Sequence, residues 1–448
     1  MKQGVLIGLA VIYMVSITSQ VSAQNSEIVQ LTLERTVRMA LENNETYLIA
    51  QLETGKAKSQ IKEAISGALP RLNLNTLVTR NWSLPEFNFG GQTFKAGTDN
   101  VLNFGMDFEQ PIYSGGKLRA GLKAARFVED LAHATSDRIR QNVILNVHQA
   151  YYAVLLADEL LGVSQASHDR AVAQLVQVKK FHAAGTASDY DVLRARVEAA
   201  TAKPPVIQAR NQVIVTQANL KSLIGMSQTT PVQVTGGFEV DAAPLTTNLP
   251  EAIQIAITRR TDLRAAEYQI DFTDRIISVT RSEGRPEVSL TAGYRMQAQL
   301  NDAKVSSLVF KDFVRSWDTS LNIKVPIFDG RQTSARVGQA EADYELAVYS
   351  QSQLRKQVEV EVTQAYVNVQ GARERMAAEA ETVELAERGL AIAQVQYEGG
   401  MTTQLELIDA QLTVTQVQTN YVTAQHDYAV AVITLQSAQG VLNIAGSE

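Results

Sequence analysis

The sequence predicts a mainly helical chain with a small β component, arranged as two copies of one unit. Each unit combines long antiparallel helical hairpins with a β-hairpin. Three observations predict this fold class. The chain repeats itself at a spacing of about 215 residues, each copy has a proline-free segment of 66 residues, and each has two stretches in which apolar and polar residues alternate. Alternation with a period of two is typical of a strand with one apolar and one wet face.

The composition is that of a folded chain and argues against several kinds of site. The 448 residues carry 41 Lys and Arg against 47 Asp and Glu, which gives a net charge of -6. A mildly acidic chain is a poor general nucleic-acid binder, because phosphate binding needs a basic face. It has no cysteine, P-loop, GxSxG or GxGxxG motif, and no close histidine cluster. We therefore expect no enzymatic activity, no cofactor and no metal site.

The first 23 residues have the parts of a secretory signal peptide. Lys2 precedes an apolar run over residues 5–17, and the small-residue stretch 21–23 follows it. We expect cleavage before Gln24 and export of the remaining chain. No later stretch approaches the roughly 18 apolar residues that a membrane-spanning helix needs. If the mature chain crosses a membrane, it does so with strands.

An ungapped alignment of the chain with itself supports the two copies. Residues 111–161 laid on residues 326–376 are identical at 16 of 51 positions, far more than unrelated segments share. An internal repeat of this length fixes the domain organisation before any single element is assigned. We assign residues 24–230 to the first repeat and residues 231–448 to the second.

Each copy begins with a helix, expected over residues 32–68 and 249–283. A β-hairpin follows, at about 71–112 in the first copy and 287–328 in the second. A polar loop, expected at 83–99 in the first copy, separates the two strands. Four strands leave two open edges and cannot close a barrel. In a membrane, open edges are not tolerated, so several chains would have to pool their strands.

The alternation gives each strand one apolar face, which would meet lipid if the strands cross a membrane. On the strand pattern alone, an ordinary half-buried hairpin in a soluble sandwich is favoured, because membrane-strand signals are weak per segment. The residues expected on this face are Leu102, Phe104, Met106, Leu290, Leu321 and Ile323. The Asn, Ser, Asp, Lys and Glu residues between them would line water.

Long helices follow each hairpin, at about 117–225 in the first copy and 332–440 in the second. Within them, residues 117–182 and 332–397 contain no proline, and 66 residues of helix measure about 100 Å. Pro204-Pro205 should kink the returning helix of the first copy. An apolar stripe with coiled-coil-like steps of three and four residues runs along both long helices. Its members are Ile139, Val143, Val147, Ala150, Val154, Ala157 and Leu161, then Leu354, Val358, Val362, Ala365, Val369, Ala372 and Met376.

Taken together, these features resemble the TolC-type family of outer-membrane efflux channels, the outer membrane factors. The resemblance covers about 420 residues. It is carried by the two copies, by the strand end Pro-Ile-(Tyr/Phe)-x-Gly at residues 111–115 and 326–330, and by the helix turn at residues 397–411. It implies a homotrimer in which a 12-stranded β-barrel is continued by an α-barrel. It also implies an equatorial belt built from residues 205–248 and 436–448.

The resemblance implies an outer-membrane exit duct of a tripartite efflux or type I secretion system, extending into the periplasm. The duct would conduct substrate passively, and its partners would be outer-membrane lipid, a periplasmic adaptor (membrane fusion protein) and an inner-membrane pump. The adaptor and pump would open it at its periplasmic tip. The helices alone also fit a periplasmic coiled-coil adaptor or scaffold without a barrel, or a secreted filament or adhesin.

The resemblance also implies roles for residues at the tip. Glu406 and Asp409 lie three residues apart on one helix face and would point into the constriction, where rings of carboxylates favour cations. On the residues alone, this pair also fits a solvated helix face. The family closes its tip with an Asp–Tyr–Arg link, which Asp191 and Tyr397 match, but Thr402 occupies the Arg position and supplies no charge. The turn residues expected to contact the adaptor are Gly185, Thr186, Gly399, Gly400 and Met401.

Overall fold

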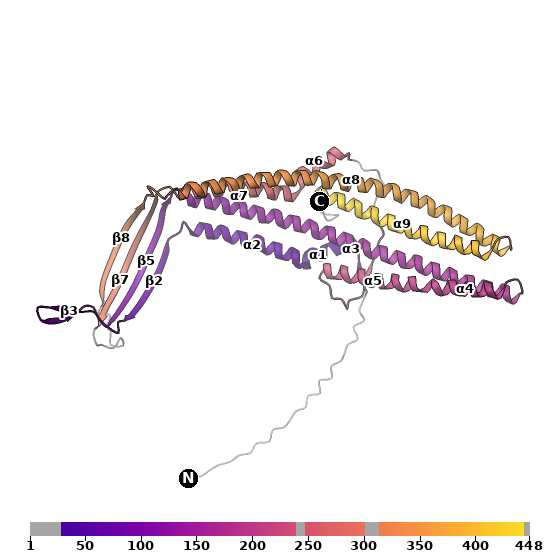
Figure 1. The fold of residues 1–448 in the computed structure, drawn as a ribbon, viewed down its shortest axis with the longest axis horizontal. Coiled ribbons are helices and arrows are strands. Elements are labelled where there is room, and N and C mark those ends of the chain that lie inside the picture. The colour runs from indigo at the N-terminus through magenta and orange to yellow at the C-terminus, as the bar shows by residue number, and fades with distance from the viewer. Residues whose placement is uncertain (1–27, 239–246, 301–312, 443–448) are drawn as a thin grey trace, which may run out of the picture.

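The computed structural model describes residues 28–238, 247–300 and 313–442. The signal segment expected at residues 1–23 and parts of both equatorial segments lie outside the described residues. The described chain is an elongated arch, in which helices occupy most of the length and a four-stranded sheet stands at one end (Figure 1). Within the described ranges, no helix has an apolar stretch long enough to cross a bilayer.

The long helix of each copy forms as predicted. Helices α3 (Lys117–Ala183) and α8 (Gln332–Glu398) have 67 residues each, so each is about 100 Å long. Both follow a residue with a left-handed backbone, Gly116 at φ 93° and Arg331 at φ 69°. The centre of the predicted apolar stripe is buried in both helices. Its buried members are Val143, Val147, Val154 and Ala157 in α3, and Val358, Val362, Ala365, Val369 and Ala372 in α8.

The helices that return from the turns differ between the copies. In the second copy the return is one helix, α9 (Gln404–Ala438), whereas in the first it is divided into α4 (Asp189–Thr201) and α5 (Lys203–Leu223). Pro204 and Pro205 lie in the first turn of α5, where they lack the N–H groups that would continue the bonding pattern of α4. The predicted interruption is therefore confirmed.

The first helix of each copy is in fact two helices, and here the prediction of one continuous helix is wrong. The four helices are α1 (Leu33–Asn43), α2 (Glu45–Ser66), α6 (Leu249–Arg259) and α7 (Thr261–Ser282). Asn44 and Arg260 separate them, with extended ψ angles of 118° and 127°. The two interruptions are 216 residues apart and therefore occupy the same position in both copies.

The helices form a curved layer that is four helices wide. Near the sheet the order is α2–α3–α7–α8, and near the turns it is α4/α5–α3–α9–α8 (Figure 1). Two clusters of buried apolar side chains hold the layer together at mid-length. One lies around α1, α3 and the end of α5, and the other lies around α6, α8 and α9. The layer therefore has two edges, one formed by α2 with α4 and α5, and the other by α8.

One antiparallel sheet contains the four predicted strands in the order β2–β5–β7–β8. The strands are β2 (Arg71–Arg80), β5 (Asn100–Ser114), β7 (Glu287–Leu300) and β8 (Val314–Lys324). The hairpin ends differ from the prediction, because β5 continues past residue 112 and β8 stops four residues before residue 328. The edges of the sheet are β2 and β8.

The segment at residues 83–99, expected to be a polar loop, contains a further β-hairpin. Strands β3 (Glu86–Phe89) and β4 (Gln92–Lys95) pair in antiparallel register. Gly90 and Gly91 connect them with φ angles of 60° and 82°. Two consecutive positive φ angles characterise the tight hairpin turn that favours glycine.

A parallel pair of short strands ties the two copies together. β1 (Val29–Leu31) pairs with β6 (Val232–Val234), which lies at the start of the second repeat, in the linker that connects α5 to α6. The buried hydroxyl of Tyr151 donates to the carbonyl oxygens of Leu31 at 3.3 Å and Thr235 at 2.5 Å. This long-range pairing fixes the linker on α3.

Candidate functional site

The two helix turns at the far end from the sheet share one backbone construction. Gly185 and Gly400 have φ angles of 78° and 70°, and each donates to the carbonyl three residues earlier, at 2.9 and 3.1 Å. Thr186 and Met401 follow them and donate to the carbonyl five residues earlier, at 2.9 and 2.8 Å. A left-handed residue at this place closes the last carbonyls of a helix, and glycine adopts it without strain. These four residues and Gly399 are exposed, so the turns are accessible to a partner.

Side chains from the two turns lie against one another. The ring centroids of Phe181 and Tyr397 are 5.9 Å apart, and the side-chain amide of buried Gln404 donates to the backbone carbonyl of Asp191 at 3.4 Å. Burial and, after it, the nearby charge of Asp191 raise the pKa of the Tyr397 hydroxyl. The structure therefore brings Asp191 and Tyr397 together, on opposite hairpins of the same chain.

The carboxylate of Asp191 is engaged by the start of its own helix. Its Oδ2 accepts from the Ser188 backbone N–H at 2.9 Å and from the Ser188 hydroxyl at 2.7 Å, and the Asp191 N–H donates back to Ser188 Oγ at 3.2 Å. This reciprocal capping box lowers the pKa of Asp191 through its hydrogen bonds. Thr402 is half-buried beside the start of α9 and contributes no charge to the pair.

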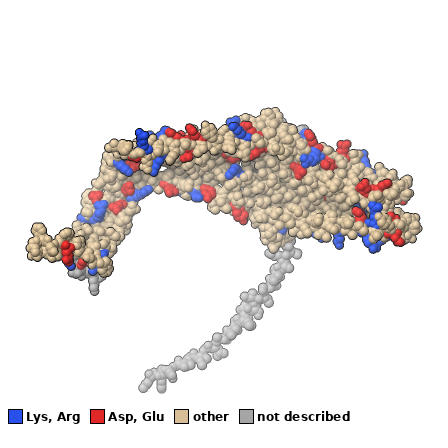
Figure 2. Space-filling view, viewed as in Figure 1, with Lys and Arg blue, Asp and Glu red and all other residues tan. Residues whose placement is uncertain are grey.

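Glu406 and Asp409 both lie on the exposed side of α9. The hydroxyl of Thr403 caps the helix by accepting from the Glu406 N–H at 3.3 Å. Leu407 and Ile408, between the two acids, are buried with exposures of 1% and 6%, so packing turns both carboxylates away from the chain's own core. Figure 2 shows acidic and basic side chains side by side at this end of the molecule.

The strand register places all six predicted lipid-facing residues on one face of the sheet. Residues directly opposite in antiparallel strands share a face. Leu321 lies opposite Leu290, and Met106 lies opposite both Leu74 and Tyr294. The same register puts Leu102, Phe104 and Ile323 on this face.

The opposite face of the sheet is polar and held by charge pairs. Arg295 Nη1 lies 2.5 Å from Asp318, and Arg295 Nη2 lies 3.8 Å from Asp107. Asn75 donates to Asp107 at 2.8 Å. These contacts link all four strands, so the polar side chains form one connected network on this face of the sheet.

Sequence reasoning missed a second site, where the return helix of each copy ends against the interrupted first helix. In the first copy, Asn44 Nδ2 donates to the carbonyl of Leu223, the last residue of α5, at 3.0 Å. Asn44 Oδ1 accepts from the N–H groups of Thr46 and Tyr47 at 3.1 and 3.3 Å. One amide therefore caps the end of α5 and the start of α2.

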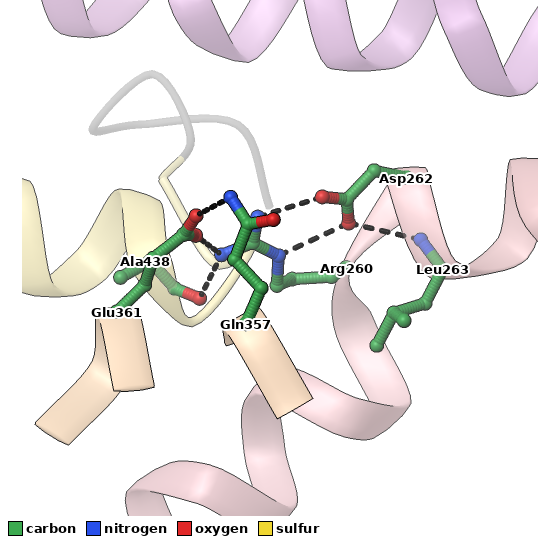
Figure 3. A network of polar contacts seen from close by, with 6 residues as sticks. All are labelled: Arg260, Asp262, Leu263, Gln357, Glu361 and Ala438. Atoms are coloured by element: carbon green, nitrogen blue, oxygen red, sulfur yellow. Dashed lines mark hydrogen bonds and ion pairs between the residues drawn. The ribbon is translucent and has the colours of Figure 1, made fainter. Parts of the chain in front are cut away.

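Arg260 occupies the equivalent place in the second copy (Figure 3). Its Nη1 donates to the carbonyl of Ala438, the last residue of α9, at 3.2 Å. Because arginine has no acceptor, Asp262 takes over the cap of α7 and accepts from the Leu263 N–H at 2.9 Å. Asp262 also accepts two bonds from the guanidinium, at 3.0 and 2.6 Å.

A third partner of Arg260 comes from the long helix α8. Glu361 Oε2 accepts from the guanidinium at 2.8 Å, and Gln357 donates to the other oxygen of Glu361 at 2.8 Å. The Arg260 and Asp262 side chains are only 15% and 16% exposed. Burial opposes both charges, but their mutual attraction and hydrogen bonds outweigh it, so the pKa of Arg260 is raised and that of Asp262 is lowered. One guanidinium thus joins α7, α8 and α9.

A glycine makes each junction close enough for these bonds. Gly225 and Gly440 have φ angles of 66° and 70°. A Cβ on Gly225 would lie 2.8 Å from the Cβ of Asn43, and one on Gly440 would lie 3.0 Å from the Cα of Arg260. The two glycines are 215 residues apart. Their equivalence in the internal alignment is the sequence signal that could have revealed the junctions.

Known proteins share the sequence pattern of this chain over most of its length. The family model described as "Outer membrane efflux protein" matches residues 36–226 and 252–441, one segment in each copy. The chain is 25% identical over 411 residues to the outer membrane protein TolC of Vibrio cholerae, which covers 90% of this chain and 89% of that protein. It is 24% identical over 396 residues to the cobalt-zinc-cadmium resistance protein CzcC of Cupriavidus metallidurans, covering 87% of this chain and 85% of that protein.

Solved structures match over the same extent. The structure of CusC superposes with a TM-score of 0.77 at 20% identity and covers 91% of this chain and 92% of its own. The CmeC outer membrane channel of Campylobacter jejuni superposes with a TM-score of 0.75 at 18% identity, covering 93% and 87%. The predicted fold class of two repeated units with long helices and strands is thereby confirmed.

Proposed function

Because the chain belongs to the outer membrane efflux protein family, we propose that three copies close one passive exit duct. Members of this family are outer-membrane channels and not enzymes. In the proposed assembly, three sheets of four strands form a 12-stranded barrel in the membrane, and the helical layers continue it as a cylinder in the periplasm. The apolar strand face meets lipid, and the polar face with Arg295 lines water.

The observation that supports closure by further copies is that each layer of the chain has two open edges on matching sides. The sheet ends in β2 on the side of the first copy and in β8 on the side of the second. The helical layer ends in α2, α4 and α5 on the first side and in α8 on the other. A head-to-tail contact between these unlike edges closes a ring when the rotation between copies is right.

Apolar side chains lie exposed along both helical edges. On the first side they are Ile49, Leu52, Leu193, Val197, Ile207 and Ile214. On the second side they are Tyr349, Val367, Leu385, Ile392 and Val395. Apolar stripes this long mark surfaces that are covered in the working state. Neighbouring copies would cover them.

The helix turns form the periplasmic end of the proposed duct. There the carboxylates of Glu406 and Asp409 from three copies would form two acidic rings at the narrowest point. The exposed turns around Gly185 and Gly400 would meet a periplasmic adaptor, and an inner-membrane pump would supply the energy. Opening would separate the contacts of Phe181 with Tyr397 and of Gln404 with Asp191.

Membrane extraction and particle mass test the proposal together. We expect the protein to stay in the outer membrane through high-salt and carbonate washes, and to give a detergent particle with the mass of three chains. The particle should form ion-conducting channels in a planar bilayer. A carbonate-soluble protein without conductance would favour the periplasmic scaffold, and a compact monomer in detergent would overturn the duct.

A further inference from the structure

We infer that Arg260 is a positioning residue for the aperture, acting on Glu406 and Asp409 through the far end of α9. This inference rests on the proposed duct. Arg260 touches neither acid. It holds the carbonyl of Ala438, at the end of α9 that is remote from the turns, and links this end to Asp262 of α7 and Glu361 of α8.

The geometry of α9 makes its remote end a sensitive place. Asp409 and Ala438 are 29 residues apart on one helix, which corresponds to about 45 Å. A tilt of about 6° at Ala438 would therefore move Asp409 by about 5 Å. The remote end of α9 is held by a close backbone approach at Gly440, by the bond from Gln141 to the Gly440 carbonyl and by the Arg260 guanidinium. Together with the packing of α9 along α8 and α3, these contacts set the angle at which α9 reaches the aperture.

The chemistry of Arg260 is suited to holding direction as well as position. A guanidinium is planar, and its paired bonds to Asp262 fix its orientation. With this orientation fixed, the guanidinium donates to Glu361 of α8 and to the Ala438 carbonyl of α9 in defined directions (Figure 3). A positive charge next to the last carbonyls of α9 is also favourable for the helix dipole.

The first copy provides an internal contrast. Asn44 caps the end of α5 with a neutral amide, through one bond to Leu223, and its remaining bonds run to α2. The cap on α5 does not extend to a long helix, whereas the cap on α9 extends to α8. The junction that carries the aperture helix is therefore the one reinforced by charge.

The decisive experiment compares single-channel conductance of four variants in planar bilayers. Arg260→Ala removes the bonds of the guanidinium to Asp262, Glu361 and Ala438 but keeps the backbone contact at Gly440. Arg260→Asn reproduces the amide cap of the first copy, and Glu361→Gln weakens only the tie to α8. Arg281→Ala is the matched control, because Arg281 pairs with Glu341 between the same helices α7 and α8 at 2.6 Å but does not reach α9. We expect Arg260→Ala to change the resting conductance at least about twofold, the other two junction variants to change it less, and Arg281→Ala to leave it unchanged.

The rate at which an engineered disulfide forms between α3 and α9 reports the position of α9 independently of conductance. We call this measurement the disulfide gauge. The hydroxyls of Ser167 on α3 and Thr415 on α9 lie 3.2 Å apart, and the chain contains no native cysteine. In a Ser167→Cys/Thr415→Cys background, we expect rapid oxidation that Arg260→Ala slows several-fold. If Arg260→Ala fails to assemble, Arg260→Asn and Glu361→Gln decide by the same two measurements.

Unchanged conductance and unchanged oxidation rate in the assembled junction variants would overturn the positioning role. An equal effect of Arg281→Ala would reduce Arg260 to a general stabiliser of the bundle, which also overturns it. If the unmodified protein conducts no ions at all, the proposed duct fails, while the disulfide gauge still reports whether Arg260 positions α9.

Discussion

Asn44 and Arg260 solve one local problem with different chemistry. At each site a return helix ends, leaving carbonyls without partners inside the helix, and another helix begins, leaving N–H groups without partners. The Asn44 amide has both a donor and an acceptor and serves both helices alone. Arg260 has only donors, so Asp262 supplies the acceptor and balances the charge. The positions are equivalent, but the second solution needs two residues.

The junction glycines give a residue-scale prediction about stability. Gly440→Ala should lower the free energy of unfolding by about 2 kcal/mol or more, because it adds a left-handed alanine and a Cβ only 3.0 Å from the Arg260 backbone. Gly185→Ala is the control, since Gly185 has a similar φ of 78° but nothing within 4 Å of the added Cβ. It should cost only about 1 kcal/mol. Denaturant unfolding followed by helical circular dichroism measures both, and equal losses would argue against close approach at the junction.

His148 gives a prediction about pH. Burial lowers its pKa, although the bond between its Nδ1 and the Ile144 carbonyl at 2.8 Å acts in the opposite direction. With a folded-state pKa below the unfolded value, the unfolded chain binds more protons in the interval between the two. The contribution of neutral His148 to the free energy of unfolding should therefore be fully present above about pH 6.5, and should be lost as the pH falls from there through the folded-state pKa.

A variant isolates this contribution from those of other groups. His148→Gln keeps a side-chain donor but cannot be protonated, so its melting temperature should depend less on pH between 8 and 5 than that of the unmodified protein. Parallel curves for the two proteins would show that His148 does not titrate differently on folding.

At the scale of elements, the sequence predicts the helices and strands that depend on neighbouring residues, and misses those that depend on distant contacts. The long helices α3 and α8 and the four main strands follow from the absence of proline and from alternation, which are properties of neighbouring residues. The interruption at Arg260 does not, because arginine is a good helix former and its extended backbone is held by contacts with Ala438 and Glu361. The β1–β6 pairing is equally non-local. The β3–β4 hairpin could have been predicted, since Gly90-Gly91 is a strong turn signal.

At the helix turns, too, local features can be predicted from the sequence and long-range contacts cannot. The helix turns carry their own glycines, so the sequence alone predicts that the chain turns at Gly185 and Gly400, and the structure has a turn at both. That the Asp191 carboxylate is already bound by Ser188 could have been inferred from the spacing of the two residues, which is that of a capping box. That Gln404 reaches the backbone of Asp191 could not, because 213 residues separate the two.

The sheet gives a prediction at the element scale. Leu321→Arg, on the apolar face opposite Leu290, should cost about 2–4 kcal/mol if it lies near the bilayer midplane. Asn322→Arg lies next to it on the polar face, where Asn322 donates to Thr291, and should be mild. The yield of assembled protein in the outer membrane measures both. Equal yields of the two variants would contradict the assigned orientation of the strands.

At the scale of the whole molecule, one chain presents half-finished surfaces. Both its sheet and its helical layer end in open edges. In the proposed assembly, further copies cover these edges and bring Glu406 and Asp409 of several chains together. Two exposed carboxylates on α9 are an ordinary helix face in one copy. In a closed ring of three, the same residues become six carboxylates around one axis, where they repel anions and attract cations.

This difference makes ion selectivity a test of the assembly itself. Glu406→Gln with Asp409→Asn would remove the proposed acidic rings while keeping side-chain size, and Leu407 and Ile408 between them remain buried and help to hold α9 in place. We expect the cation-to-anion permeability ratio, measured from reversal potentials in a salt gradient, to fall several-fold. Replacing Glu398, which is exposed at the end of α8 on the other side of the turn, by Gln is the matched control and should change the ratio little. If selectivity survives the double change, the narrowest charged ring of the duct lies elsewhere, and Glu406 and Asp409 are only a solvated helix face.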